Sequence, residues 1–134
     1  MTEHRIRFRG AWDWIVREGE AEVARRVTLP TGWPPGVASP FQLLRRFGRP
    51  PGDPAMHSAR LELIDVPGLV VALLNGVEVA RPPRGAWRCT VPLAGPLLAR
   101  NALVLEVDLE SAPGPTPSWG SIALVIGPKG SSSG

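Results

Sequence analysis

The sequence predicts an all-β domain, a two-sheet antiparallel β-sandwich of the jelly-roll type. Apolar residues alternate with charged or polar residues along several short segments, which is the pattern of half-buried strands. The chain also contains 15 glycines and 16 prolines, which favour frequent turns and oppose long helices. We therefore expect roughly eight to ten short strands, with turns about every 8–12 residues and almost no helix.

The N-terminal half predicts four strands, near 5–9, 12–17, 25–29 and 41–47. Along the first two, aromatic and aliphatic residues occupy one parity, and arginines and an aspartate occupy the other. Gly10 lies between these two strands, where we expect a bend. Residues 19–22, 31–36 and 48–58 are expected to be turns or loops, because they are polar or rich in glycine and proline.

The C-terminal half predicts six more strands, at 60–66, 69–74, 77–80, 87–91, 101–109 and 119–126. Residues 93–98 are expected to form at most one helical turn, because glycine and proline interrupt them. With 134 residues the chain is long enough for one ordinary core. We expect a single domain over residues 1–126 and a disordered tail rich in Gly and Ser over residues 127–134.

Asn75-Gly76 is the strongest turn signal in the sequence. A type I′ hairpin turn needs positive φ at both central residues, and this dipeptide supplies it. The two-residue loop is expected to pair Leu74 with Val77 and Ala72 with Val79. The predicted core face of this hairpin then contains Val70, Ala72, Leu74, Val77 and Val79.

The composition is arginine-rich but points to no charged partner. Lys129 is the one lysine among 15 basic residues, so 14 are arginines, yet the net charge is only +3. Arg5, Arg7 and Arg9 share one parity and would form a basic stripe, but the other arginines are scattered among acidic residues. We attribute them to codon bias and expect no nucleic-acid partner.

The sequence also argues against a membrane or secreted protein. No apolar run approaches the ~18 residues that span a bilayer. The first residues lack the apolar region of a signal peptide, so we expect a cytoplasmic location. Cys89 is the one cysteine, which excludes an intrachain disulfide and a zinc site built from cysteines.

No pattern of catalytic residues is present. A glycosidase needs two carboxyl groups on either side of the bond, whereas Asp13 and Asp65 are both expected to be turn or edge residues. His4 and His57 are expected at a chain end and in a loop, away from a nucleophile. We therefore expect a protein with no catalytic residues, no metal site and no cofactor.

The order of several short motifs resembles the galactose-binding-like jelly-roll domain. The closest form is the sugar-binding domain of the β-galactosidase and β-glucuronidase family of glycoside hydrolases. The resemblance covers most of residues 5–126. The matching stretches are 8–12 with 27–30 and Trp33, then 60–63 with 74–76, and then 100–107 with 119–124.

This resemblance implies a sugar-binding ancestry and does not extend to hydrolysis. In the family enzymes the domain presents an acidic residue and an arginine beside the last tryptophan, directed toward the active site of a neighbouring barrel. Here Ser118 and Gly120 flank Trp119, and no barrel is present. The resemblance thus implies an accessory domain related to those of glycoside hydrolases.

The candidate ligand-binding residues are Trp33, Arg45, Arg49 and Trp119. Either tryptophan can be a buried loop anchor or an exposed plate for a sugar ring, whereas we expect Trp12, Trp14 and Trp87 in the core. The favoured function is a non-catalytic carbohydrate-binding or carbohydrate-binding-derived module. The alternative is a structural or protein-interaction module with no sugar ligand, and the sequence leaves the ligand and the oligomeric state open.

Overall fold

The computed structural model describes residues 3–33, 40–50, 57–83, 87–93, 97–109 and 119–128. Within these residues it contains ten β-strands and no α-helix, which confirms the predicted fold class. None of the described residues belongs to a helix that is long and apolar enough to cross a membrane.

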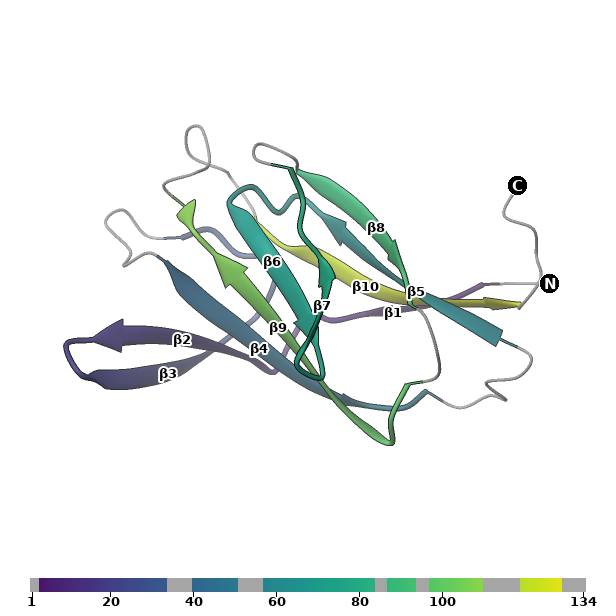
Figure 1. The fold of residues 1–134 in the computed structure, drawn as a ribbon, viewed down its shortest axis with the longest axis horizontal. Coiled ribbons are helices and arrows are strands. Elements are labelled where there is room, and N and C mark those ends of the chain that lie inside the picture. The colour runs from purple at the N-terminus through teal and green to yellow at the C-terminus, as the bar shows by residue number, and fades with distance from the viewer. Residues whose placement is uncertain are drawn as a thin grey trace.

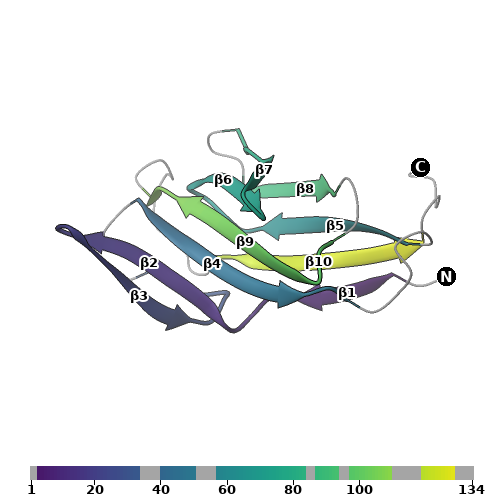
Figure 2. The same ribbon diagram turned by 60° about the horizontal axis from the view of Figure 1, so that its bottom comes forward.

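The strands form two antiparallel sheets that pack face to face (Figures 1 and 2). The four-stranded sheet has the order β1 (His4–Arg7), β10 (Ser121–Pro128), β5 (His57–Ile64) and β8 (Arg88–Pro92). The six-stranded sheet has the order β3 (Ala21–Val27), β2 (Trp12–Glu18), β4 (Phe41–Gly48), β9 (Arg100–Val107), β6 (Leu69–Leu74) and β7 (Val77–Ala80).

The core lies between the two sheets and follows the period-two pattern of the sequence. In β9, Leu103, Leu105 and Val107 are fully buried, while the intervening residues are half-buried and point to the opposite face. The lone Cys89 packs against the edge of this core. Other fully buried side chains come from both sheets: Trp12, Leu43, Leu61, Leu63 and Leu124.

The β6–β7 hairpin has the predicted turn but only part of the predicted register. Asn75 and Gly76 have φ angles of 54° and 83°, as a type I′ turn requires. Leu74 pairs with Val77 as expected, but Ala72 pairs with Ala80 and not with Val79. The reason is a register shift between Ala72 and Leu73, where an extra residue enters one strand.

The predicted core face of this hairpin is therefore wrong at two positions. Val70 is 37% exposed and Val77 is 64% exposed, whereas Leu69 and Ala72 are buried in the core. A second register shift, between Leu69 and Val71 against β9, changes which residues point inward. Val77 lies beside the turn on the edge strand β7, where it has no strand on its far side.

Several strand ends differ from the sequence-based boundaries. β3 begins at Ala21, because Gly19 and Glu20 form a tight turn that pairs Glu18 with Ala21. β10 continues through Pro128, which pairs with His57, so residues 127–128 belong to the sheet and not to a tail. The rest of the predicted tail and the centre of the predicted helical turn lie outside the described residues.

Candidate binding site at the tryptophan-rich end

No described aromatic side chain lies on the broad outer face of either sheet. The chain has five tryptophans, three phenylalanines and no tyrosine, and all eight aromatic residues are described. Seven of them belong to the core cluster or pack against it, and Trp87 is the exception. A sugar ring that stacks on an aromatic plate must therefore bind at an end of the sandwich and not across a sheet face.

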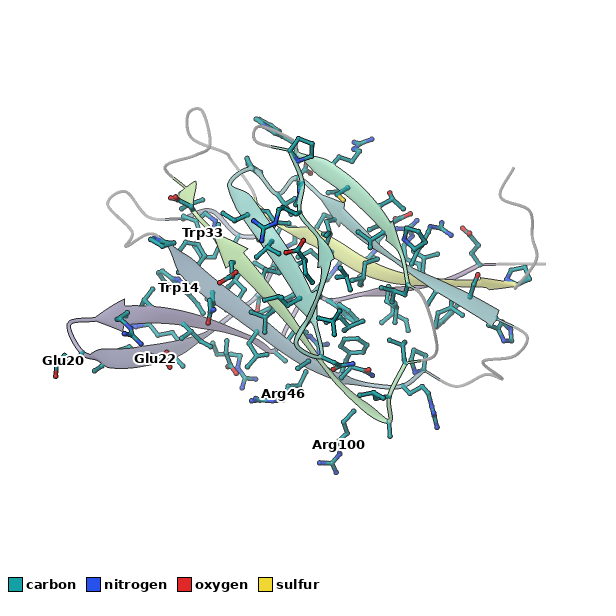
Figure 3. The ribbon with its side chains drawn as sticks, in the orientation of Figure 1. Trp14, Glu20, Glu22, Trp33, Arg46 and Arg100 are labelled. Carbon is teal, nitrogen blue, oxygen red and sulfur yellow. The ribbon has the colours of Figure 1, made fainter. Side chains whose placement is uncertain are left out.

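Four aromatic rings gather at one end of the sandwich, around Trp33. Its ring centroid lies 4.8 Å from that of Phe41, 5.4 Å from that of Trp14 and 5.8 Å from that of Trp119. A short antiparallel bridge holds the last contact, with Thr31 and Trp119 exchanging backbone hydrogen bonds of 2.9 and 2.7 Å. We call this cluster the tryptophan-rich end; Figure 3 labels Trp14 and Trp33 there.

The sequence leaves open whether Trp119 is a buried loop anchor or an exposed plate, and the structure shows it buried. Its side chain is fully buried, and its indole N–H donates a 2.6 Å hydrogen bond to the carbonyl of Pro67. This bond and the 2.7 Å bond from Gly120 N to Asp65 O fix the turn between β5 and β6. Trp119 is thus an anchor of the loop in this structure, and its ring offers no exposed plate.

Trp14 and Trp33 each have a buried indole N–H with no hydrogen-bond acceptor. Both side chains are otherwise half-buried, and they touch each other through their rings. A buried donor without an acceptor costs about 1–3 kcal/mol, and native proteins contain few of them. The tryptophan-rich end therefore carries two indole N–H groups for which the described residues supply no hydrogen-bond acceptor.

Trp87 is 45% exposed, which corrects the expectation that it fills the core. It lies one residue before β8, at the end of the four-stranded sheet, and its carbonyl accepts a 3.1 Å hydrogen bond from Val66 N. This contact ties it to the same turn that Trp119 anchors. Asp65 and Arg88, the neighbours of Val66 and Trp87 in the chain, are both exposed.

Arg45 lies well away from the tryptophan-rich end, on the inward parity of β4. Its guanidinium sits over the Phe8 ring, 5.1 Å from the centroid, and its buried Nε has no acceptor. Burial lowers the pKa of this guanidinium from its usual value, and the charge of Arg26 acts in the same direction. Phe41 begins the same strand, which places Arg45 about 13 Å from the tryptophan cluster at ~3.3 Å per residue.

Arg49 is exposed and lies beyond the far end of β4. Its backbone N donates a 3.2 Å hydrogen bond to Ala99 O. Along the strand direction it is about 26 Å from Phe41. The structure thus brings Trp33 and Trp119 together and separates them from Arg45 and Arg49, so one small ligand cannot contact all four residues.

Arg5 of β1 forms part of an ion-pair network on the outer face of the four-stranded sheet. Arg5 pairs with Glu62, and Arg60 pairs with Glu3 at 2.7 Å and with Glu62 at 3.4 Å. The network covers Val125, which is buried although it points outward. The predicted basic stripe is therefore partly neutralised by carboxylates.

The described residues show no arrangement suited to a metal. No group of three His, Cys, Asp or Glu side chains in these ranges lies close enough to hold an ion. Asp13 is on the outer face of the six-stranded sheet, where it pairs with Arg26 at 3.0 Å and with Arg46 at 4.0 Å.

Comparison with known proteins supports the predicted fold resemblance. The chain matches an FMN-binding β-glucuronidase from Facaelibacterium prausnitzii L2-6 with a TM-score of 0.71 and 18% identity, over 94% of this chain and 23% of that chain. A GH2 β-galacturonidase from Eisenbergiella tayi matches with a TM-score of 0.69 and 14% identity, over 92% and 24%. A β-glucuronidase from Ruminococcus gnavus matches with a TM-score of 0.67 and 12% identity, over 94% and 29%.

These matches concern the fold alone, because the identities are low. The chain spans about a quarter of the length of each of these chains. No protein-family model and no curated protein sequence matches it.

Proposed function

We propose that the chain is a non-catalytic accessory module that binds a carbohydrate at Trp87, beside the tryptophan-rich end. The exposed ring of Trp87 carries this proposal, because it is the one aromatic side chain outside the core. An indole can stack on the apolar face of a pyranose ring, and Asp65 and Arg88 can accept and donate hydrogen bonds to hydroxyl groups beside it.

The arginine partners of three described carboxyl groups agree with a non-catalytic role. The general acid of a glycosidase needs a raised pKa, so that it still carries a proton near neutral pH. Arginine partners instead lower the pKa values of Glu3, Glu62 and Glu78. The length of the chain, about a quarter of that of the similar enzymes, agrees with an accessory domain.

A glycan array followed by calorimetric titration tests this function. We expect the wild-type protein to bind at least one glycan and Trp87→Ala to lose at least about tenfold in affinity, or ~1.4 kcal/mol. Val77→Ala, which shortens an exposed apolar residue at the opposite end, is the matched control and should bind as the wild type does. A folded protein that binds no glycan would exclude the proposal.

The alternative, a protein-interaction module on the same fold, has its own supporting observation. The outer face of the six-stranded sheet carries a stripe of half-buried aliphatic side chains, at Ile15, Leu44, Leu73 and Val104. Outward faces of antiparallel sheets are commonly polar where they meet solvent. This stripe favours a second surface for binding, distinct from the tryptophan-rich end.

A further inference from the structure

One row of side chains crosses the outer face of the six-stranded sheet from edge to edge. Their inward neighbours along the strands, such as Trp12, Leu43 and Leu103, are fully buried, so these residues point outward. The pairing registers place six residues on this transverse row, in the order Arg26, Asp13, Leu44, Val104, Leu73 and Glu78.

The transverse row has an apolar centre and ends of opposite charge. Leu44, Val104 and Leu73 form the centre, and each is half-buried and so still partly exposed. Arg26 on β3 marks one edge, and Glu78 on β7 marks the other. Their side chains are 66% and 47% exposed, so both charges are within reach of a partner.

We propose that this face binds the same face of a second copy of the chain. A two-fold axis parallel to the strands, between β4 and β9, reverses the transverse row in the second copy. Leu44 then faces Val104 of the second copy, and Arg26 faces Glu78 of the second copy. Because the interface is isologous, each contact occurs twice.

The charges of Arg26 and Glu78 also favour this axis over a two-fold axis that lies in the plane of the sheet and runs perpendicular to the strands. An axis perpendicular to the strands would place Arg26 on Arg26 and Glu78 on Glu78, and like charges in contact are repulsive. Arg26 already contacts Asp13 at 3.0 Å, and Glu78 contacts Arg81 at 2.8 Å. A guanidinium has five N–H donors and a carboxylate about four acceptor sites, so each can accept a further partner.

The area of the outer face determines how strongly the two copies are expected to associate. Six strands spaced ~4.8 Å apart, with a few outward rows, give roughly 500 Å² per copy. A stable complex of standard size buries about 800 Å² per partner. We therefore expect a weak dimer that dissociates on dilution, with added salt weakening it further.

Sedimentation velocity over a range of protein concentrations tests the proposal, with charge reversals at the two ends of the row. The wild-type sedimentation coefficient should rise with concentration toward that of a dimer. Arg26→Glu and Glu78→Arg should each stay monomeric, because each variant alone places like charges together. An equimolar mixture of the two variants should associate as the wild type does, since every cross-pair then has opposite charges.

The mixture separates an interface effect from a folding defect, because damaged proteins do not restore association to one another. Arg7→Glu reverses a charge on β1, in the other sheet, and should leave association unchanged. A wild type that stays monomeric up to ~1 mM, single variants that associate normally, or a mixture that stays monomeric would each overturn the proposal. Glycan binding is measured separately, so its presence or absence does not affect this result.

Discussion

The side chain of Asn75, in the β6–β7 turn, donates a 3.1 Å hydrogen bond to Oδ1 of Asn101, near the start of β9. Oδ1 of Asn75 in turn accepts a 2.8 Å bond from Ala102 N. Asn101 is almost fully buried and also bonds both backbone groups of Leu98, through Leu98 N at 3.0 Å and Leu98 O at 2.9 Å. Asn75 therefore combines a conformational role in the turn with a link to the neighbouring strand.

Asn75→Gly separates these two roles. Glycine keeps the positive φ but removes both side-chain hydrogen bonds and leaves Ala102 N without its acceptor. We expect the free energy of unfolding, measured by urea denaturation, to fall by about 1–3 kcal/mol. Val77→Ala, at an exposed neighbour of the turn, should change it by less than ~0.5 kcal/mol. Equal stability of Asn75→Gly and the wild type would show that the side chain contributes nothing to folding.

Leu105→Ala and Val104→Ala compare the two faces of β9. Leu105 is fully buried in the core, whereas Val104 is half-buried on the outer face. We expect Leu105→Ala to cost about 2–4 kcal/mol, because it leaves a cavity, and Val104→Ala to cost less. Denaturation at a low protein concentration gives both values, and the reverse order would contradict the assigned faces.

Local alternation was sufficient to predict the strands, and long-range contacts explain what it missed. The pattern in 101–109 correctly places Leu103 and Leu105 inside, because burial depends on parity within a strand. The register of Ala72 could not be predicted, because β6 pairs with β7 and β9 at once and its register shifts against both. A two-residue turn fixes only the pairs next to it.

In the candidate site, too, strand parity could have predicted one residue and could not have predicted another. Trp87 lies just before β8 and belongs to no strand, so strand parity does not report its exposure. The inward position of Arg45, in contrast, could have been predicted, since it shares the parity of Phe41 and Leu43. A candidate ligand residue should thus be tested against the parity of its own strand before its charge is considered.

Glu62 should make part of the stability depend on pH. Its hydrogen bond with Arg5 is the largest cause that lowers its pKa, and the charges of Arg5 and Arg60 add to it. A lowered carboxyl pKa stabilises the fold above the usual value of 4.5, and this contribution is lost as the pH falls through the lower, folded-state pKa. We expect the free energy of unfolding of the wild type to fall from about pH 5 toward pH 3.

Glu62→Gln should remove part of that fall, because glutamine does not titrate. Glu78→Gln is the matched control. Its pair with Arg81 also lowers the pKa of Glu78, but both side chains are largely exposed, and solvent screens the pair. Urea denaturation between pH 3 and 7 gives the comparison. Equal losses of pH dependence in the two variants would rule out a special contribution from the Glu62 network.

Gly68 and Gly76 have nearly the same backbone conformation in different surroundings. Their φ angles are 88° and 83°, a region that alanine adopts only with strain. A Cβ at Gly76 meets no atom within 4 Å, whereas a Cβ at Gly68 would lie 2.8 Å from the carbonyl oxygen of Asp108. Gly76→Ala should therefore cost only the conformational strain, about 1–2 kcal/mol.

Gly68→Ala should cost clearly more, about 3 kcal/mol or above, because the clash adds to the same strain. The clashing atom cannot move freely, since Asp108 N donates a 2.8 Å hydrogen bond to Gly68 O and holds the two segments together. Thermal and urea denaturation of both variants measure the difference, in which the shared strain cancels. If the two variants were equally stable, the segment at Asp108 would have to yield without cost, and the close approach of the β5–β6 turn to the end of β9 would not be a rigid contact.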